Sequence, residues 1–150
     1  MGDSVDVLIV GAGISGIGIA YYLQRDHPQR SYLIVEARGT SGGTWDLFRY
    51  PGVRSDSDLH TFGYEFRPWR SNVAIADGDS ILTYLRETAA EYGIDRHTRY
   101  HTRAVSASWS SDDVRCRRST IAAAATDESR DPAQAWTVPV HPAPAAPLPA

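Results

Sequence analysis

Cysteine is almost absent from this chain of 150 residues, since Cys116 is the only one. A single thiol excludes an internal disulfide framework and any cysteine-rich zinc or iron–sulfur site. The five histidines are scattered without the spacing of metal ligands, so we expect no metal site. One cysteine also fits a reducing compartment, and the expected location is therefore the cytoplasm.

A large excess of charge of either sign is also lacking. The formal net charge is -3 at pH 7, and the isoelectric point is near 5.9. Such a balance gives no general attraction to nucleic acid or to an anionic membrane. The apolar stretch from Val5 to Leu23 contains three spaced glycines and follows no basic residue, which argues against a signal peptide and a membrane span. We expect a soluble protein with neither partner.

A glycine-rich turn carries the clearest functional signal. Residues 5–10 are typical of a buried parallel strand, and residues 14–25 of the helix that follows it. Between them, Gly11 permits a tight turn, Gly13 lets the backbone approach a pyrophosphate, and Gly16 lets the helix pack closely on the strand. Free N–H groups at the start of the helix would then face the phosphates.

An acidic residue completes the pattern. Glu36 ends a second apolar strand, 31–36, twenty residues beyond the last glycine, where its carboxylate would accept hydrogen bonds from a ribose. Its charge would repel a 2′-phosphate, so FAD or NAD fits this site better than NADP. Gly42-Gly43 favours FAD, because glutathione-reductase-like flavoproteins use such a pair to bring a second backbone segment to the cofactor. The predicted fold is α/β, with a Rossmann-like βαβ FAD-binding domain.

The rest of the chain divides into a structured part and a tail. Residues 37–78 lack periodicity, as in a long segment that wraps a ligand. A helix is predicted from a cap at Asp79 or Ser80 to about Tyr92, and it ends at Gly93. Its apolar face is expected to consist of Ile81, Leu82, Leu85, Ala89 and Tyr92. A strand follows over 99–109. The partial FAD/NAD(P)-binding domain is therefore placed at 1–109.

Residues 110–150 are expected to be a divergent, disordered tail rich in alanine and proline. Six of the nine prolines follow Asp131, and no packed core is expected from residue 141 onward. Residues 135–140 could form one last strand, which Pro139 would confine to a sheet edge. Near the start of this tail, Arg115, Arg117 and Arg118 follow two aspartates and are expected to lie in a solvated turn.

Several motifs together resemble the start of the class B flavoprotein monooxygenases. They are the glycine turn 11–16, the run 42–58 and the element Phe66-Arg67-Pro68-Trp69. This family includes the flavin-containing and the Baeyer–Villiger monooxygenases, and the sequence is most similar to the Baeyer–Villiger-type branch that oxidises ketones and thio compounds. The resemblance extends from about residue 5 to residue 109. It implies an N-terminal FAD-binding segment of a glutathione-reductase-like fold.

The resemblance also implies a reaction and a set of site residues. In the family NADPH reduces FAD, and O2 then adds to the flavin C4a to give a peroxide that attacks a ketone carbonyl or a sulfur or nitrogen atom. Asp56 matches the family's aspartate near the isoalloxazine and nicotinamide rings, and is the expected catalytic residue. The other expected contacts are Gly11, Gly13, Ser15 and Gly16 at the pyrophosphate, Glu36 at the ribose, Gly43, Thr44, Trp45, Asp46 and Leu47 toward the flavin, Arg54 and Ser55 toward NADPH, and the backbone of Ala104 at the adenine. Trp69 is expected to be an ordinary core aromatic.

Four features of complete family members are missing. They are a second GxGxxG for NADPH, the FxGxxxHxxxW fingerprint, the active-site arginine and the strand that completes the FAD sheet. We therefore expect a truncated or frameshifted product, or one with a divergent insertion after residue 109, that does not oxygenate a substrate alone. Two alternatives stay open: a non-catalytic nucleotide-binding fragment, and an NAD-dependent reductase, which Gly42-Gly43 and the lack of a substrate domain disfavour.

Overall fold

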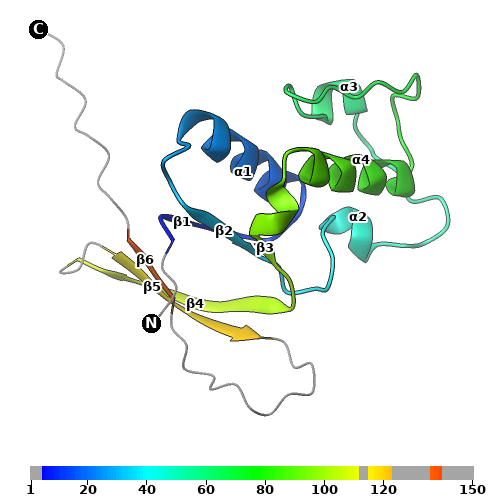
Figure 1. Ribbon diagram of the computed structural model, residues 1–150. Helices are drawn as coiled ribbons and strands as arrows, with labels where there is room; N and C mark the ends of the chain where they lie inside the picture. Colours follow the sequence, from blue (N-terminus) through cyan, green and yellow to red (C-terminus); the bar gives the residue numbers. More distant parts are fainter. Residues whose placement is uncertain (1–4, 112–114, 123–135, 140–150) are drawn as a thin grey trace, which may run out of the picture.

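The predicted βαβ unit is present and forms the parallel part of the molecule (Figure 1). The computed structural model describes residues 5–111, 115–122 and 136–139. Strand β1 (Val7–Val10) leads into helix α1 (Ile14–Asp26), which leads into β2 (Tyr32–Val35). Strand β2 pairs in parallel with β1 and with the two-residue β3 (Thr98–Arg99), so the sheet order is β1-β2-β3. This order confirms the α/β prediction.

Glu36 is held by backbone hydrogen bonds just beyond the end of β2. Its N–H donates to the carbonyl of Arg99 at 2.9 Å, and its own carbonyl accepts from the N–H of Thr102 at 2.8 Å. A segment more than sixty positions further along the chain therefore fixes both sides of this residue. The Glu36 side chain is thereby presented at the carboxyl end of the parallel strands, where open α/β sheets bind ligands.

The predicted helix before Gly93 is α4 (Gly78–Glu91), and it begins earlier than expected. Asp77, rather than Asp79 or Ser80, is the N-cap: its Oδ1 accepts from the Ser80 N–H at 2.8 Å. Gly93 follows the helix with a left-handed φ of 64°, the conformation that ends many helices. Several acceptable capping residues lie side by side at 77–80, which is why sequence alone placed the cap wrongly.

Replacing Asp77 tests this cap. Asp77→Ala is expected to lower the free energy of unfolding by about 1 kcal/mol, whereas Asp77→Asn should retain most of the stability. Hydrogen bonds from Ser80 lower the pKa of Asp77 below its ordinary 3.8. The carboxylate's contribution is therefore complete above that value and is lost as the pH falls through the lower pKa of the folded state. Urea unfolding followed by circular dichroism, near neutral pH and in acid, measures the effect of each substitution and its dependence on pH. If Asp77→Asn and Asp77→Ala lowered the free energy of unfolding equally, Asp77 would not be the N-cap.

Segment 37–78 is largely irregular, as predicted, but contains two single-turn helices. They are α2 (Thr44–Leu47) and α3 (Leu59–Phe62). Asp58 caps α3, because its side chain accepts from the His60 N–H at 2.7 Å. One turn is too short to show a helical period, so sequence patterning could not reveal these helices. Helix α2 packs against α4 and is thereby fixed relative to the core.

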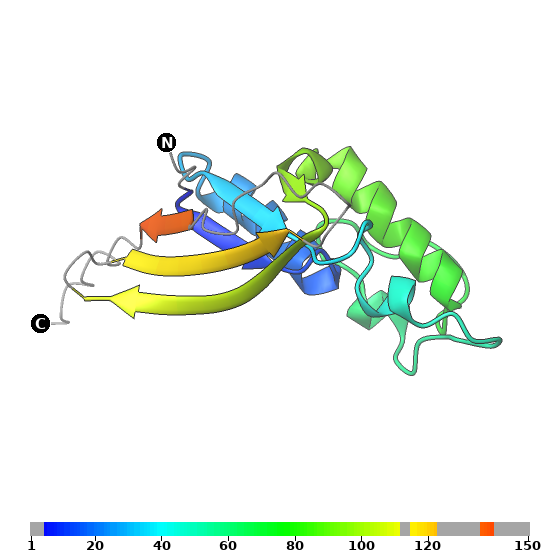
Figure 2. The same cartoon turned by 90° about the horizontal axis from the view of Figure 1, so that it is seen from below.

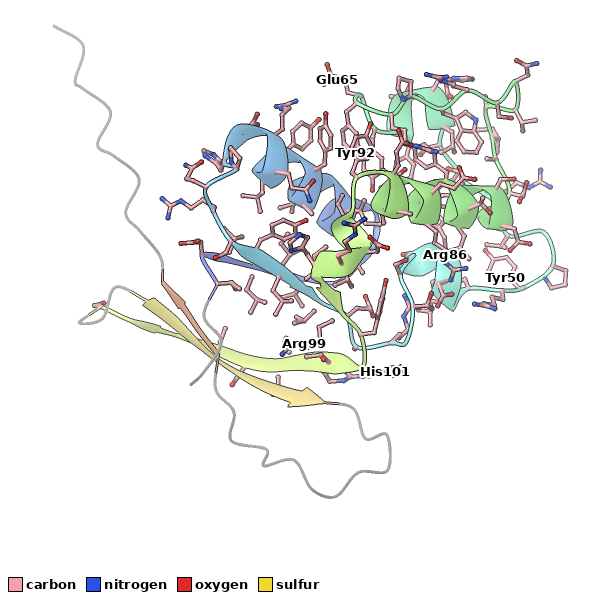
Figure 3. The ribbon with its side chains drawn as sticks, viewed as in Figure 1. Tyr50, Glu65, Arg86, Tyr92, Arg99 and His101 are labelled. Carbon is pink, nitrogen blue, oxygen red and sulfur yellow. The ribbon has the colours of Figure 1, made fainter. Side chains whose placement is uncertain are left out.

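The strand predicted over 99–109 is divided between two sheets. Strand β3 belongs to the parallel sheet, whereas β4 (Thr102–Ser110) begins a separate antiparallel sheet of order β4-β5-β6 (Figure 2). The break coincides with His101, the one described residue other than glycine with a positive φ, 52°. Figure 3 shows Arg99 and His101 where the chain passes from one sheet to the other.

Two strands occur where the sequence predicted a tail. Strand β5 (Arg115–Ala122) pairs with β4, so the predicted solvated turn at Arg115, Arg117 and Arg118 is wrong. Strand β6 (Trp136–Pro139) lies at the sheet edge and ends on Pro139, which confirms the predicted edge strand. Pairing with β4 supplies the backbone hydrogen bonds that composition could not predict. The residues from 141 onward lie outside the described part of the chain.

One cluster of buried apolar side chains joins the parallel sheet to α1 and α4. The apolar face predicted for α4 is confirmed at four positions, because Ile81, Leu82, Leu85 and Ala89 are all buried. The fifth, Tyr92, follows the helix as its C-cap and packs partly buried against the cluster. Trp69 packs against this cluster, as predicted. Among the described residues, no helix is long and apolar enough to cross a bilayer.

Candidate dinucleotide-binding site

The first glycine turn has the geometry that its spacing predicts. Gly11 has a φ of +97°, which favours glycine, and its N–H donates to the carbonyl of Val35 at 2.8 Å. A Cβ on Gly16 would collide with the carbonyl oxygen of Gly11, so only glycine lets α1 pack this closely on the turn. Gly13 is the N-cap of α1 and makes no side-chain cap hydrogen bond. The N–H groups of the first helical turn are therefore free to bind an anion.

The second glycine turn lies directly against the first. Gly42 and Gly43 have φ values of +125° and +56°, and the Gly42 N–H donates to the carbonyl of Ala12 at 2.9 Å. A Cβ on Gly13 would stand 3.4 Å from the Gly43 Cα, and a Cβ on Gly43 would stand 3.0 Å from the Gly13 Cα. The pair therefore brings a second backbone segment to the phosphate turn, which is the geometry that favoured FAD.

The Glu36 carboxylate reaches back to the first turn. It is 7% exposed, and its Oε2 accepts from the Ala12 N–H at 2.9 Å. Its Oε1 accepts from the Arg38 N–H at 3.0 Å. Each carboxylate oxygen can accept more than one hydrogen bond, so lone pairs remain for ribose hydroxyls. The structure thus brings Glu36 and both glycine turns together.

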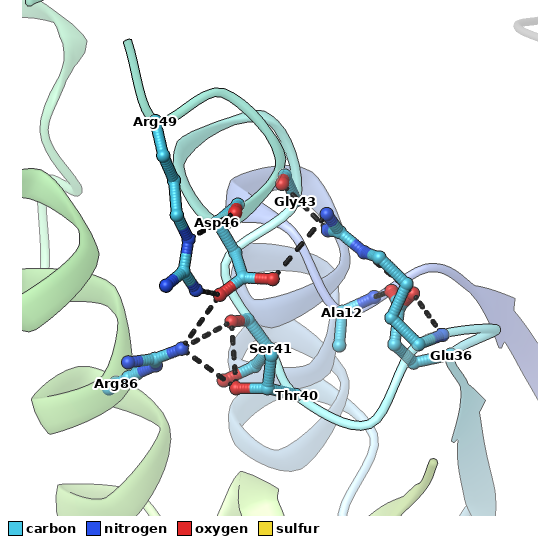
Figure 4. A network of polar contacts seen from close by, with 9 residues as sticks. Ala12, Glu36, Thr40, Ser41, Gly43, Asp46, Arg49 and Arg86 are labelled. Atoms are coloured by element: carbon cyan, nitrogen blue, oxygen red, sulfur yellow. Dashed lines mark hydrogen bonds and ion pairs between the residues drawn. The ribbon is translucent and has the colours of Figure 1, made fainter. Parts of the chain in front are cut away.

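Asp46 is buried among three arginines, to none of which the sequence analysis gave a role in the site (Figure 4). Its carboxylate lies 2.6 Å from Arg49 Nη2, 3.0 Å from Arg86 Nη2 and 3.5 Å from Arg38 Nη1. Arg86 comes from α4, and in Figure 3 it points toward α2.

Residues 54–56, which were predicted to lie near NADPH and the flavin, are held by backbone contacts near the start of α4 rather than by the glycine turns. The Ser55 N–H donates to the carbonyl of Ala76 at 2.9 Å, and Arg54 forms a backbone bridge with Asp77 at the start of α4. Ser55 is buried, whereas the side chains of Arg54 and Asp56 are exposed. Within the described ranges, no hydrogen bond or ion pair links Asp56 to either glycine turn. Its role in catalysis stays a prediction.

The other predicted residues differ in exposure. Ser15 and Thr44 are exposed, Leu47 is 60% exposed, and Trp45 packs partly against the core. Ala104 lies half-buried in β4, opposite Thr120 of β5. These positions leave the predicted contacts with the flavin and the adenine untested.

A separate groove of about 670 Å³ lies between residues 66–71 and the outer face of α4. Arg67 crosses it and pairs with Glu87 at 3.0 Å and Glu91 at 2.8 Å. None of the predicted cofactor residues lines this groove. It is therefore distinct from the two glycine turns.

Comparison with known proteins agrees with this geometry. Residues 9–73 match the NAD(P)-binding Rossmann-like domain. The FAD-containing monooxygenase EthA of Mycobacterium tuberculosis is 57% identical over 77% of this chain and 24% of its own length. The probable FAD-binding monooxygenase AlmA of Acinetobacter baylyi is 52% identical over 73% of this chain and 22% of its own length. Over this segment the chain is therefore similar in sequence to FAD-containing monooxygenases and to NAD(P)-binding Rossmann-like domains.

Solved structures of monooxygenases have a similar fold over most of this chain. An oxidised steroid monooxygenase bound to NADP superposes with a TM-score of 0.74 at 28% identity, over 91% of this chain and 25% of that protein. The FAD-bound form of OTEMO gives a TM-score of 0.74 at 26% identity, over 89% and 24%. The chain therefore spans about a quarter of the length of the monooxygenases that it matches.

Proposed function

We propose that residues 5–109 bind FAD as part of an NADPH-dependent flavin monooxygenase of the Baeyer–Villiger type. The observation that carries this proposal is the direct contact between the two glycine turns, with the Glu36 carboxylate beside them. NAD-dependent reductases have no use for a second glycine turn at this point, so the contact disfavours that alternative. The names of the relatives support the same cofactor.

Each part of the site then has a physical task. Gly11, Gly13, Ser15 and Gly16 present backbone N–H groups and the positive end of α1 to the pyrophosphate. Glu36 accepts hydrogen bonds from the ribose, and residues 43–47 lie toward the flavin. When bound, FAD supplies the redox chemistry, accepting hydride from NADPH and activating O2. Arg54, Ser55 and Asp56 face the NADPH side, and the backbone of Ala104 contacts the adenine.

The substrates and location are part of the same proposal. We infer O2 and a small ketone, or a sulfur or nitrogen compound, as substrates of the full-length family, and the cytoplasm as the location. Because the chain spans about a quarter of the length of its relatives, we infer that oxygenation requires further parts of the enzyme that lie outside this chain. In the alternative, a non-catalytic nucleotide-binding fragment, the chain binds the dinucleotide and acts without those parts.

Binding of FAD to the purified chain tests the proposal. We expect the protein to show a visible flavin spectrum as purified, or after incubation with FAD and removal of unbound FAD by gel filtration, and to quench flavin fluorescence on titration. NAD should bind far more weakly to the same preparation. A folded chain that retains no flavin after free FAD is removed by gel filtration, and that does not change the fluorescence of added FAD, would overturn the proposal. Equal affinity for NAD would favour the reductase alternative.

A further inference from the structure

Arg38 joins the ribose carboxylate to the second glycine turn. Its backbone N–H donates to Glu36 Oε1, and its Nη2 donates to the carbonyl of Gly43 at 2.6 Å. Its Nε stands 3.6 Å from Glu36, and its Nη1 is 3.5 Å from Asp46. The guanidinium group of Arg38 therefore lies between the Glu36 carboxylate, the Asp46 carboxylate and the backbone carbonyl of Gly43.

Arg86 approaches the same segment from α4. Its Nη2 donates to Thr40 Oγ1 at 2.8 Å and to Asp46 Oδ1 at 3.0 Å, and it lies 3.4 Å from the carbonyl of Ser41. These acceptors flank the Gly42-Gly43 turn on both sides (Figure 4). Arg86 thus connects the turn to a helix whose other face is packed in the core.

Arg49 makes a different contact with the same carboxylate. Among the described residues, its hydrogen bonds go to Asp46, three positions earlier in the chain: to the backbone oxygen at 3.0 Å and to Oδ1 at 2.6 Å. Its side chain is 69% exposed, compared with 43% for Arg86 and 30% for Arg38. Arg49 therefore adds charge next to Asp46 without touching either glycine turn, which makes it a matched control.

The buried groups of this network, which are the carboxylates of Glu36 and Asp46 and the Nη1 atom of Arg38, argue for a role other than stability. Arg38 Nη1 is fully covered and has no hydrogen-bond partner, which is a cost to the folded state. Buried ion pairs contribute little net stability, because desolvation offsets the attraction between the charges. Three guanidinium groups against the two carboxylates of Glu36 and Asp46 also leave a positive charge beside the phosphate turn, which favours a bound dianion.

We propose that Arg38 and Arg86 are positioning residues that hold the Gly42-Gly43 turn against the first glycine turn in the geometry that binds the dinucleotide. This inference rests on the proposed function, because FAD is the probe. Neither arginine needs to touch the cofactor. Each acts through the second turn, and both act on the same turn, so their effects on binding are coupled.

The test compares Arg38→Met, Arg86→Met and Arg49→Met in the full chain. Arg38→Met and Arg86→Met are each expected to raise the FAD dissociation constant by about tenfold or more, and Arg49→Met by less than about twofold. The double variant should lose less than the product of the two single losses. At saturating FAD, visible circular dichroism of the bound flavin should change in the first two variants and not in Arg49→Met, a signature that lost stability alone would not produce.

The outcomes separate the two proposals. If the wild-type chain fails to bind FAD, the proposed function is overturned. If it binds, and all three variants match it in affinity and in flavin circular dichroism, the positioning role is overturned while the function stands. Should Arg38→Met fail to fold, Arg38→Lys applies the same test, because lysine keeps the charge but lacks the planar fork that reaches Gly43 and Asp46 together.

Discussion

Gly16→Ala is expected to destabilise the chain by about 3 kcal/mol or more. Helix propensity alone predicts the opposite sign, since alanine in a helix interior is about 1 kcal/mol better than glycine. The added Cβ would collide with the backbone carbonyl of Gly11, and a backbone atom in a tight turn cannot move aside as a side chain can. Packing should therefore outweigh propensity. Urea or thermal unfolding, followed by far-UV circular dichroism, measures the difference.

Gly18→Ala is the matched control for that experiment. It lies in the same helix, and its Cβ would stand 3.1 Å from Cε1 of Tyr64, a ring edge that can shift by a few tenths of an ångström. The gain in propensity and the cost of this shift should nearly cancel, so the expected change is within about 1 kcal/mol. If both variants behaved alike, the close packing of α1 on Gly11 would not be the reason for glycine at position 16.

Gly13→Val is expected to abolish FAD binding without unfolding the chain. A Cβ at position 13 would stand 3.4 Å from the Gly43 Cα, which is ordinary contact, and Gly13 has a φ of -88° that any residue adopts. The larger branched side chain would instead occupy the approach to the first-turn N–H groups. Losing hydrogen bonds to a charged phosphate costs about 3 kcal/mol, which is roughly a hundredfold in the dissociation constant. Fluorescence titration with FAD measures this loss.

Gly13→Ala provides the graded control. Its single methyl group should weaken FAD binding less than valine does, and both variants should keep the unfolding midpoint of the wild-type chain. Valine that bound FAD with wild-type affinity would refute close approach of the cofactor to position 13. A joint loss of binding and stability would show that Gly13 serves the contact between the turns rather than the phosphate.

The parts of the site that sequence predicted are those fixed by local backbone requirements. The positive φ of Gly11, the close packing at Gly16 and the carboxylate at the end of β2 each follow from residue type and spacing. The sequence also predicted that Gly42-Gly43 brings a second backbone segment to the site, and glycine is needed at position 43 because its φ is positive and a Cβ there would stand 3.0 Å from the Gly13 Cα. These features need no knowledge of the rest of the fold.

The arginine network could not be predicted, because tertiary packing assembles it. Arg86 and Asp46 lie forty positions apart and meet only after α2 packs on α4. The sequence contains fifteen basic residues and gives no sign of which ones reach a buried carboxylate. Strand β5 was missed for a similar reason: its polar, arginine-rich composition is typical of a loop, and its pairing with β4 overrides that preference.

The hydrogen bonds that hold Glu36 set the order in which the site can assemble. Strands β1 and β2 are close in sequence, but Arg99 and Thr102 reach Glu36 only after the intervening chain, with α4, has been synthesised and folded. Contacts between such distant positions carry a large loop-closure cost and form late. During synthesis, the first 97 residues would therefore leave the backbone N–H and carbonyl of Glu36 without these partners, and the edge of β2 would stay unpaired until residues 98–102 had emerged.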